Sequence, residues 1–215
     1  MRFALLFFAL TLPLLSQSKW QLALNRDGVK VYERKIAGTS LIEVKARTTL
    51  NFAIQDLLAV ILDYKRFKEW QPYLKRFERL ITHSDYQFIN YFEMNLPWPV
   101  NNRDLVTKTN ITVDQKGKWV HIFMREVSHK SRPRRPGIVR IPLNRGKWSF
   151  KPVSGGKRVY VEFTFRTDPG GSTPHWLVNW VAKYRIASGF KNLKARMKKV
   201  KGDYGNEVVK AIKNW

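Results

Sequence analysis

The sequence predicts an α+β fold in which a curved antiparallel β-sheet grips one long C-terminal α-helix. Three observations lead to this prediction. Most of the chain after Gly28 alternates apolar and polar residues with the period of two that is typical of strands. Helical periodicity is confined to a stretch after Asn51 and to a segment from Pro174 to about Lys201. Short turn-like segments join several strands, which favours an antiparallel meander.

The first 18 residues have the pattern of a secretory signal peptide. They contain one positive residue, an apolar run from Phe3 to Leu15 and the small-x-small sequence Ser16-Gln17-Ser18. The run is shorter than the ~20 residues that span a bilayer, so a retained membrane anchor is the weaker alternative. We therefore expect residues 1–18 to be a signal peptide and residues 19–215 to form one exported domain, periplasmic or secreted.

Strand-like alternation recurs in residues 28–36, 40–50, 85–96, 103–113, 117–127, 145–153 and 158–167. Because successive strand residues point to opposite faces, two apolar rows can be assigned to single faces. One row consists of Val159, Val161, Phe163 and Phe165, and the other of Phe88, Phe92, Met94 and Leu96. Such rows are typical either of a solid core or of the lining of a ligand cavity, and patterning alone favours the core.

Two regions carry the predicted helices. Asn51 is a plausible N-cap for a helix through about Tyr64, followed by a shorter helical or irregular piece around residues 73–80. In the C-terminal helix one broad face carries Trp176, Leu177, Trp180, Val181, Tyr184, Ala187 and Ser188. Further along, one side carries Lys191, Lys194 and Lys198. We expect the first half to be buried and the second half to face water or anions.

The net charge of the chain limits the classes of partner that we expect it to bind. Forty Lys and Arg residues against sixteen Asp and Glu residues give a net charge of +24, which attracts anionic membranes or nucleic acid. The chain has no recognisable helix for reading DNA and no aromatic signature of RNA recognition, and export also argues against nucleic acid. A polyanion or nucleic-acid binder therefore stays an alternative. We expect an anionic membrane surface as the partner of a monomer.

Signals of catalysis are weak. The four histidines are scattered without metal-ligand spacing, and the chain has no cysteine. It also has no Gly-x-Ser-x-Gly turn and no glycine-rich phosphate loop. We therefore expect no catalytic residue, no metal site and no cofactor. An enzyme that acts on an apolar substrate is the less favoured alternative.

Five ordered blocks of the sequence resemble one known family, the START lipid-transfer domains. The blocks are "KWQLALNRDGVKVYERKIAGTSLIEVKART", "AVILDYKRFKEWQPYLKRFERL", "LPWPVNNRDLV", "RPGIVRIPLNRGKWSF" and "TDPGGSTPHWLVNWVAK". Together they span nearly all of the chain after the predicted signal peptide. The resemblance implies a helix-grip fold, with the sheet wrapped around an apolar tunnel that the C-terminal helix and loops close. It also implies that the protein binds one hydrophobic lipid, of phospholipid, sterol-like or fatty-acyl type, and carries or senses it at membranes.

The resemblance also implies roles for residues. The expected ligand-binding residues are Arg103, Phe88, Phe92, Met94, Phe163, Phe165, Trp176, Trp180 and Tyr184. In the family a charged residue in the tunnel can pair with the polar group of a lipid, and Arg103 of "NNRDL" is the candidate. The alternative for Arg103 is a buried salt bridge with a nearby carboxylate, because buried charges are costly unless paired.

Two segments are expected to gate the tunnel and to meet the membrane. In "TDPGGSTPH" we expect Gly170 and Gly171 to form a hinge, Thr173 to cap the last helix and Pro174 to take its first position. Trp176 and Trp180 would cover the tunnel or anchor at lipid headgroups, with simple packing as the alternative. In the basic loop, residues 128–140 with the sequence "SHKSRPRRPGIVR", we expect gating or docking roles for Arg132, Arg134, Arg135, Gly137 and Ile138. An ordinary solvated loop is the alternative there.

Overall fold

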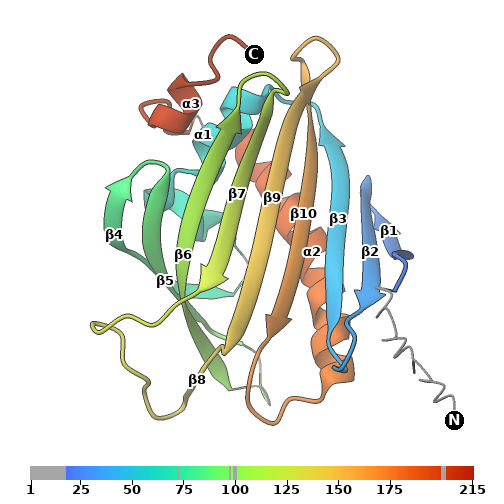
Figure 1. Cartoon of the computed structure of the whole chain (residues 1–215), viewed down its shortest axis with the longest axis vertical. Helices are drawn as coiled ribbons and strands as arrows, with labels where there is room; N and C mark the ends of the chain where they lie inside the picture. Colours follow the sequence, from blue (N-terminus) through green and yellow to red (C-terminus); the bar gives the residue numbers. More distant parts are fainter. Residues whose placement is uncertain (1–17, 72, 97, 99–100, 200–201) are drawn as a thin grey trace, which may run out of the picture.

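The computed structural model describes residues 18–71, 73–96, 98, 101–199 and 202–215; within these ranges the side chains of His175, Trp180 and Val181 are not described. The predicted signal peptide lies outside the described residues except for Ser18, whose hydroxyl donates to the carbonyl of Lys35. The fold is of the predicted class. One large curved antiparallel sheet wraps around a long C-terminal helix (Figure 1).

The sheet is built from β1 (Gln21–Arg26), β2 (Val29–Lys35), β3 (Ile42–Leu50), β4 (Leu74–Ser84), β5 (Gln87–Met94), β6 (Asn102–Asp114), β7 (Trp119–Glu126), β8 (Ile138–Arg140), β9 (Leu143–Val153) and β10 (Arg158–Asp168). The helices are α1 (Ile54–Ile61), the 3₁₀ helix η1 (Tyr64–Glu69), α2 (His175–Met197) and α3 (Glu207–Lys210). All seven segments that alternate with period two in the sequence form strands. β1 and β8, which are short and carry little alternation, were not predicted.

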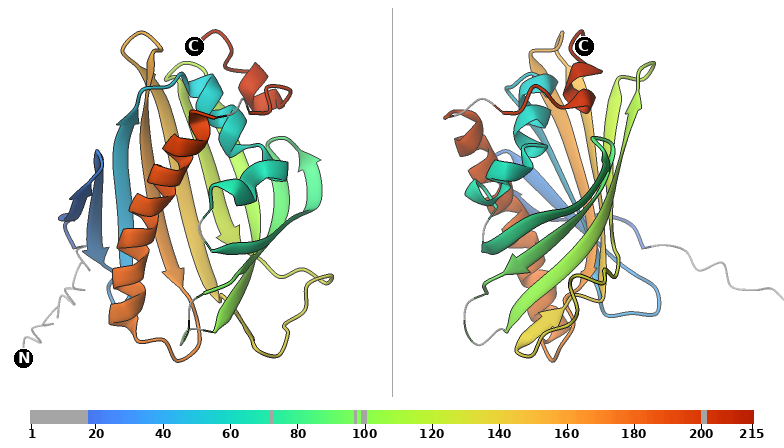
Figure 2. Two further views of the ribbon diagram at one scale, coloured as in Figure 1. Left: turned by 180° about the vertical axis from the view of Figure 1, so that it is seen from behind. Right: turned by 90° about the vertical axis from the view of Figure 1, so that its left-hand side faces the viewer.

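The strands follow the order β1-β2-β3-β10-β9-β7-β6-β5-β4, and β8 pairs in parallel with the start of β6. Helix α2 crosses the concave face of the sheet, while α1 and η1 lie beside it on the same side (Figure 2). The predicted row on β10 faces this side, since Val159 and Val161 are fully buried. The long helix therefore lies in the curve of the sheet, as the sequence predicts.

A solid core fills one end of the concave face. Ile54, Leu57 and Leu58 of α1 are fully buried, as are Phe190 and Leu193 near the end of α2. Full burial of one such side chain contributes about 1.5–3 kcal/mol. The second half of α2, which we expected to face water or anions, therefore also anchors the helix to the sheet. The other end of the concave face contains the polar residues described below.

Two local predictions are wrong. Residues 73–80 are not helical, because most of them lie in strand β4. The alternation of β4 is hidden by register shifts against β5 at three places, each of which moves the side-chain pattern by a residue. Asn51 is not an N-cap either, because α1 begins only at Ile54 and Ala53 precedes it without a side-chain cap.

The connection between β10 and α2 differs from the prediction in its capping. Gly170 and Gly171 have φ values of 67° and 73°, which favour glycine. The carboxylate of Asp168 accepts a hydrogen bond from the backbone N–H of Gly170. Pro174 precedes the helix with an extended backbone, and no side chain caps the helix there. The hydroxyl of Thr173 instead accepts a hydrogen bond from Arg103.

Candidate functional site

An aromatic pocket opens on the concave face of the sheet. Its walls come from α1, η1, β4, β5, β6, β7 and β9 and include Phe67, Trp70, Phe77, Phe88, Phe92 and Trp148. The rings of Phe67 and Phe77 stack at a centroid distance of 4.8 Å, and those of Phe77 and Phe92 meet edge to face at 4.9 Å. The cavity has a volume of about 70 Å³. Drug-sized ligands occupy roughly 300–1,000 Å³, so a larger guest requires the walls to move apart.

The structure gathers some of the predicted ligand-binding residues around this pocket. Phe88 and Phe92 line it. Phe163 stacks on the lining residue Trp148 at 4.2 Å, and Phe165 stacks on Phe163 at 5.7 Å. Met94 lies beside Arg103 in the β5–β6 pairing.

Trp176 and Tyr184, two helix residues of the same prediction, lie elsewhere. The side chain of Trp176 is 72% exposed at the start of α2, and Tyr184 is 39% exposed. Neither lines the pocket. The side chain of Trp180 is outside those described. The exposed position of Trp176 agrees with the anchor interpretation of this residue better than with that of a cover over the cavity.

Arg103 lies on the concave face near the start of β6, and its side chain is almost completely buried, with 3% exposure. Its Nη2 donates to the hydroxyl of Thr173 at 2.6 Å and to the carbonyl of Gly170 at 3.4 Å. Its Nη1 donates to the carbonyl of Asn101. Arg103 therefore links the start of β6 to the glycine-containing connection before α2.

The charge of Arg103 has no carboxylate partner. Among the described residues no ion pair includes Arg103, and its buried Nε has no hydrogen-bond acceptor. Burial lowers the pKa of the guanidinium below its usual value, and no acidic side chain counteracts this effect. The alternative of a buried salt bridge is therefore wrong. Asp104 and Glu93 form a cross-strand pair, which puts both of them on the face opposite to Arg103.

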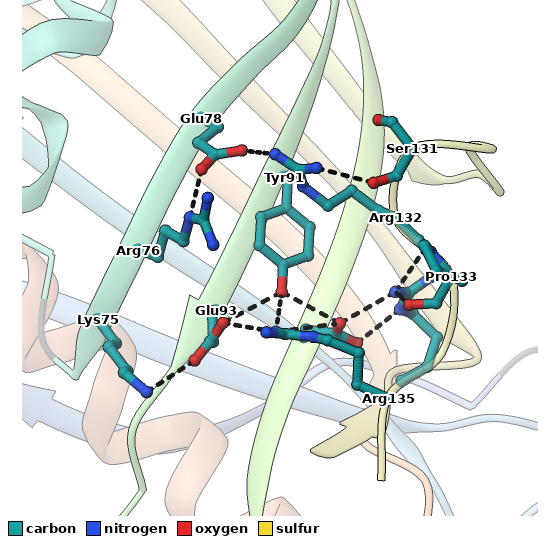
Figure 3. Close-up of polar contacts among 11 residues, drawn as sticks. Lys75, Arg76, Glu78, Tyr91, Glu93, Ser131, Arg132, Pro133 and Arg135 are labelled. Atoms are coloured by element: carbon teal, nitrogen blue, oxygen red, sulfur yellow. Dashed lines mark hydrogen bonds and ion pairs between the residues drawn. The ribbon is translucent and has the colours of Figure 1, made fainter.

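On the convex side an ionic cluster surrounds Glu93, as Figure 3 shows, and the neighbouring Asp104. Glu93 accepts from Arg135 at 2.6 Å and pairs with Lys75 at 3.0 Å. Asp104 accepts two hydrogen bonds from Arg140, at 2.6 and 2.9 Å. The Arg135 hydrogen bond, together with Lys75, holds the pKa of Glu93 at about 2 despite its burial. Two buried carboxylates thus attach the basic loop and β8 to the sheet.

Tyr91 lies at the centre of this cluster. Its hydroxyl accepts from Arg135 at 2.6 Å and lies within hydrogen-bonding distance of both Asp104 and Glu93. Burial and the negative charge of Asp104 raise the pKa of Tyr91 to about 12. The phenol therefore stays protonated through the neutral range and can donate to a carboxylate.

Two of the arginines that were predicted to dock at a membrane form ion pairs within the protein. Arg132 pairs with Glu78, and Arg135 pairs with Glu93, so both guanidinium groups have carboxylate partners. Arg134 is exposed, Gly137 has a φ of 74°, and Ile138 begins β8. The docking role of this loop stays a prediction. Arg134 is the arginine of the three best placed to reach a membrane.

Sequence reasoning missed several residues. Trp98 is 92% exposed between β5 and β6, and its place between two prolines in "LPWP" is a signal that could have marked it. Arg79 lines the aromatic pocket, although the sequence suggested a helical segment around it. In the part of the chain that the structure describes, no helix is long and apolar enough to cross a membrane.

Comparisons with known proteins agree with this geometry. The model of the START domain family matches residues 9–202. Rat phosphatidylcholine transfer protein is 32% identical over 187 residues, which cover 84% of this chain and 85% of the relative. The crystal structure of a STAR-related lipid transfer protein from Xanthomonas axonopodis is 30% identical with a TM-score of 0.76, covering 84% of this chain and 99% of that one.

The same fold also occurs in proteins with little sequence identity to this chain. An aromatase/cyclase from Streptomyces, 9% identical with a TM-score of 0.55, covers 74% of this chain and 94% of its own, so the same architecture also serves an enzyme. The similar proteins with stronger sequence identity are named as lipid transfer proteins. A long helix in the curve of the sheet, an aromatic pocket on the concave face and a family model over residues 9–202 point to the same conclusion. The chain belongs to the START domain family.

Proposed function

We propose that this protein is a carrier that binds one phospholipid between the sheet and α2, with Arg103 holding the phosphate group of the lipid. The observation that carries the proposal is the buried guanidinium of Arg103, which has an unused Nε and no carboxylate partner within the described ranges of the chain. A buried charge without a counter-charge is costly, and an anionic ligand supplies one. The names of the similar phosphatidylcholine transfer proteins support the same ligand class.

A phospholipid accounts for this site better than a sterol. The hydroxyl of a sterol can accept a hydrogen bond from Arg103, but it leaves the positive charge unneutralised. A phosphate both neutralises the guanidinium and accepts several hydrogen bonds from it. The aromatic pocket further along the concave face offers an apolar surface for acyl chains.

We propose the end of the molecule that contains Arg103 as the membrane-facing end. The basic loop, the β10–α2 connection and the start of α2 lie together at the lower end in Figure 1. The exposed Trp176 belongs to this end, and both its indole and that of Trp98 suit the headgroup region of a bilayer. With a net charge of +24, attraction to an anionic surface is strong until salt screens it. An exported monomer would carry its lipid outside the cytoplasm.

The test is extraction followed by transfer. Protein purified under native conditions and extracted with organic solvent should release one phospholipid per chain, as measured by mass spectrometry. Arg103→Met should lower lipid retention and vesicle-to-vesicle transfer by about tenfold or more, because a charged hydrogen bond is lost. Arg158→Met, the same change at an exposed position of β10, is the matched control and should transfer normally. Extracts without lipid, together with no transfer from loaded vesicles, would contradict the proposal.

A further inference from the structure

A second set of polar side chains crosses the concave face away from Arg103. Arg79 of β4 is paired across the strands with Asn90 of β5, and Asn90 is paired with Thr107 of β6. Directly paired residues in neighbouring strands point to the same face of a sheet. Arg79 and Asn90 both line the aromatic pocket, so this polar row of Arg79, Asn90 and Thr107 faces the same side.

The polar row has hydrogen-bonding capacity that the described protein does not use. The Nε of Arg79 donates to the side-chain oxygen of Asn90 at 2.7 Å. No hydrogen bond of the two Nη groups of Arg79 is found among the described residues, and no carboxylate there lies within ion-pair distance of them. Thr107 is 2% exposed, and its hydroxyl has no partner in the same part of the chain. Asn90 is 5% exposed, so the row is not simply a solvated surface.

The surroundings of Arg79 are aromatic rather than acidic. Its guanidinium carbon lies 3.6 Å from the ring centre of Phe88 and 4.7 Å from that of Tyr64. Burial lowers the pKa of this guanidinium, and the more distant Tyr64 and Asp85 counteract the effect only in part. Stacking on aromatic rings holds the guanidinium plane in place. It does not satisfy the outward N–H groups.

The polar row and Arg103 lie at different places on the concave face. Thr107 follows Arg103 by four residues on β6, which at about 3.3 Å per residue puts it roughly 13 Å further along the strand. A single phosphate at Arg103 cannot also reach Arg79. The concave face therefore carries two separate cationic positions, one beside the β10–α2 connection and one in the aromatic pocket.

We propose that the polar row is a second ligand subsite, which binds a carboxylate carried by an acyl chain. The two free Nη groups of Arg79 match the two oxygens of a carboxylate, and the aromatic walls match the chain that carries it. The hydroxyl of Thr107, two strands away from Arg79, offers a further donor. The carboxylate can belong to a free fatty acid or to the end of a phospholipid chain. This inference rests on the proposed lipid-binding function and adds a second polar group to the ligand.

The experiment compares three probes on delipidated protein: phosphatidylcholine with two methyl-terminated chains, phosphatidylcholine with one carboxylate-terminated chain of the same length, and a free fatty acid. Dissociation constants are measured by titration, and the readout is the ratio between the methyl-terminated lipid and each carboxylate probe. We expect a carboxylate probe to bind the natural protein about tenfold more tightly than the methyl-terminated lipid. The source of the carboxylate is identified by which of the two probes, the fatty acid or the modified phospholipid, binds more tightly than the methyl-terminated lipid.

Variants separate this inference from the proposed function. Arg79→Met should bring the ratio close to one, whereas Arg158→Met, the exposed control, should keep it. Thr107→Val, which resembles threonine in shape, should lower the ratio several-fold and provides a second measurement if Arg79→Met does not fold. The subsite alone is overturned if the natural protein binds methyl-terminated phosphatidylcholine as tightly as the carboxylate probes. It is also overturned if the preference for a carboxylate probe persists in both Arg79→Met and Thr107→Val. Failure of all three probes to bind the natural protein overturns the proposed function instead.

Discussion

Arg103 and Asp104 are neighbours in the sequence, yet among the described residues only Asp104 has oppositely charged partners. Asp104, on the convex side, accepts two hydrogen bonds from Arg140 and lies 4.0 Å from Arg135. Arg103, on the concave side, has three hydrogen bonds to uncharged oxygens and no counter-charge among the described residues. Both side chains are buried. The protein therefore compensates the buried charge on one face of β6 and leaves the buried charge on the other uncompensated.

The contrast separates a charge that holds segments together from a charge that we propose to bind a ligand. A fully paired carboxylate holds segments together, because its removal leaves several cations without a partner. A buried cation without a partner stabilises nothing by its charge and is suited to an anion from outside. Three measurements test this distinction.

The largest effect is expected from Asp104→Asn. The change leaves Arg140 without its carboxylate partner, and breaking a buried ion pair on one side costs about 3–5 kcal/mol. Urea denaturation should show this loss in the free energy of unfolding. Glu207→Gln, which affects an exposed pair with Lys210, is the control and should leave the free energy of unfolding nearly unchanged, because water screens exposed ion pairs. Equal losses in the two variants would mean that the convex cluster has no special structural role.

The second effect concerns the acid stability of the cluster. The pKa of Glu93 is lowered from 4.5 to about 2 in the folded protein, so folding is favoured when this carboxyl is ionised. Its contribution is complete above pH 4.5 and is lost as the pH falls toward 2. The linked free energy is up to about 3 kcal/mol. Denaturation midpoints measured from pH 6 to pH 2 should decline more steeply in the natural protein than in Glu93→Gln. Parallel profiles would contradict the assignment.

The smallest effect is expected from Arg103→Met in the lipid-free protein. The variant loses hydrogen bonds to the β10–α2 connection but also removes a desolvated charge, so the two contributions oppose each other. We expect the free energy of unfolding to change by less than about 1 kcal/mol. The measurement is urea denaturation of delipidated protein beside the Asp104→Asn variant. A loss as large as that of Asp104→Asn would show that Arg103 is structural and would remove the contrast.

Much of the fold follows from the sequence because its signals are local. The alternation of residues 158–167 and the helical spacing after Pro174 each depend on neighbours a few positions away. β4 could not be predicted in the same way, because its register shifts appear only when β5 lies beside it. The cap expected at Thr173 is absent because α2 begins only at His175, after Pro174. The Thr173 hydroxyl instead accepts a hydrogen bond from Arg103, which lies 70 residues earlier in the chain.

The candidate site was predictable only in part. Arg103 was found through the resemblance to a family, and Phe88 and Phe92 through strand parity. The missing counter-charge of Arg103 depends on which face Glu93 occupies, and the polar row depends on the pairing of three strands. Such relations are tertiary. They have no counterpart in composition or spacing, which is why Arg79, Asn90 and Thr107 were not among the predicted site residues.

The alternation of β6 also has a consequence for how the protein can evolve. Arg103 and Asp104 are encoded by adjacent codons, but their side chains lie on opposite faces of one strand. If Arg103 holds the lipid phosphate as proposed, a mutation of the first codon alters which ligand the concave face binds, while the attachment of β8 through Asp104 is kept. Ligand preference can therefore diverge between descendants of this chain one amino acid at a time, without the loop having to be rebuilt at each step.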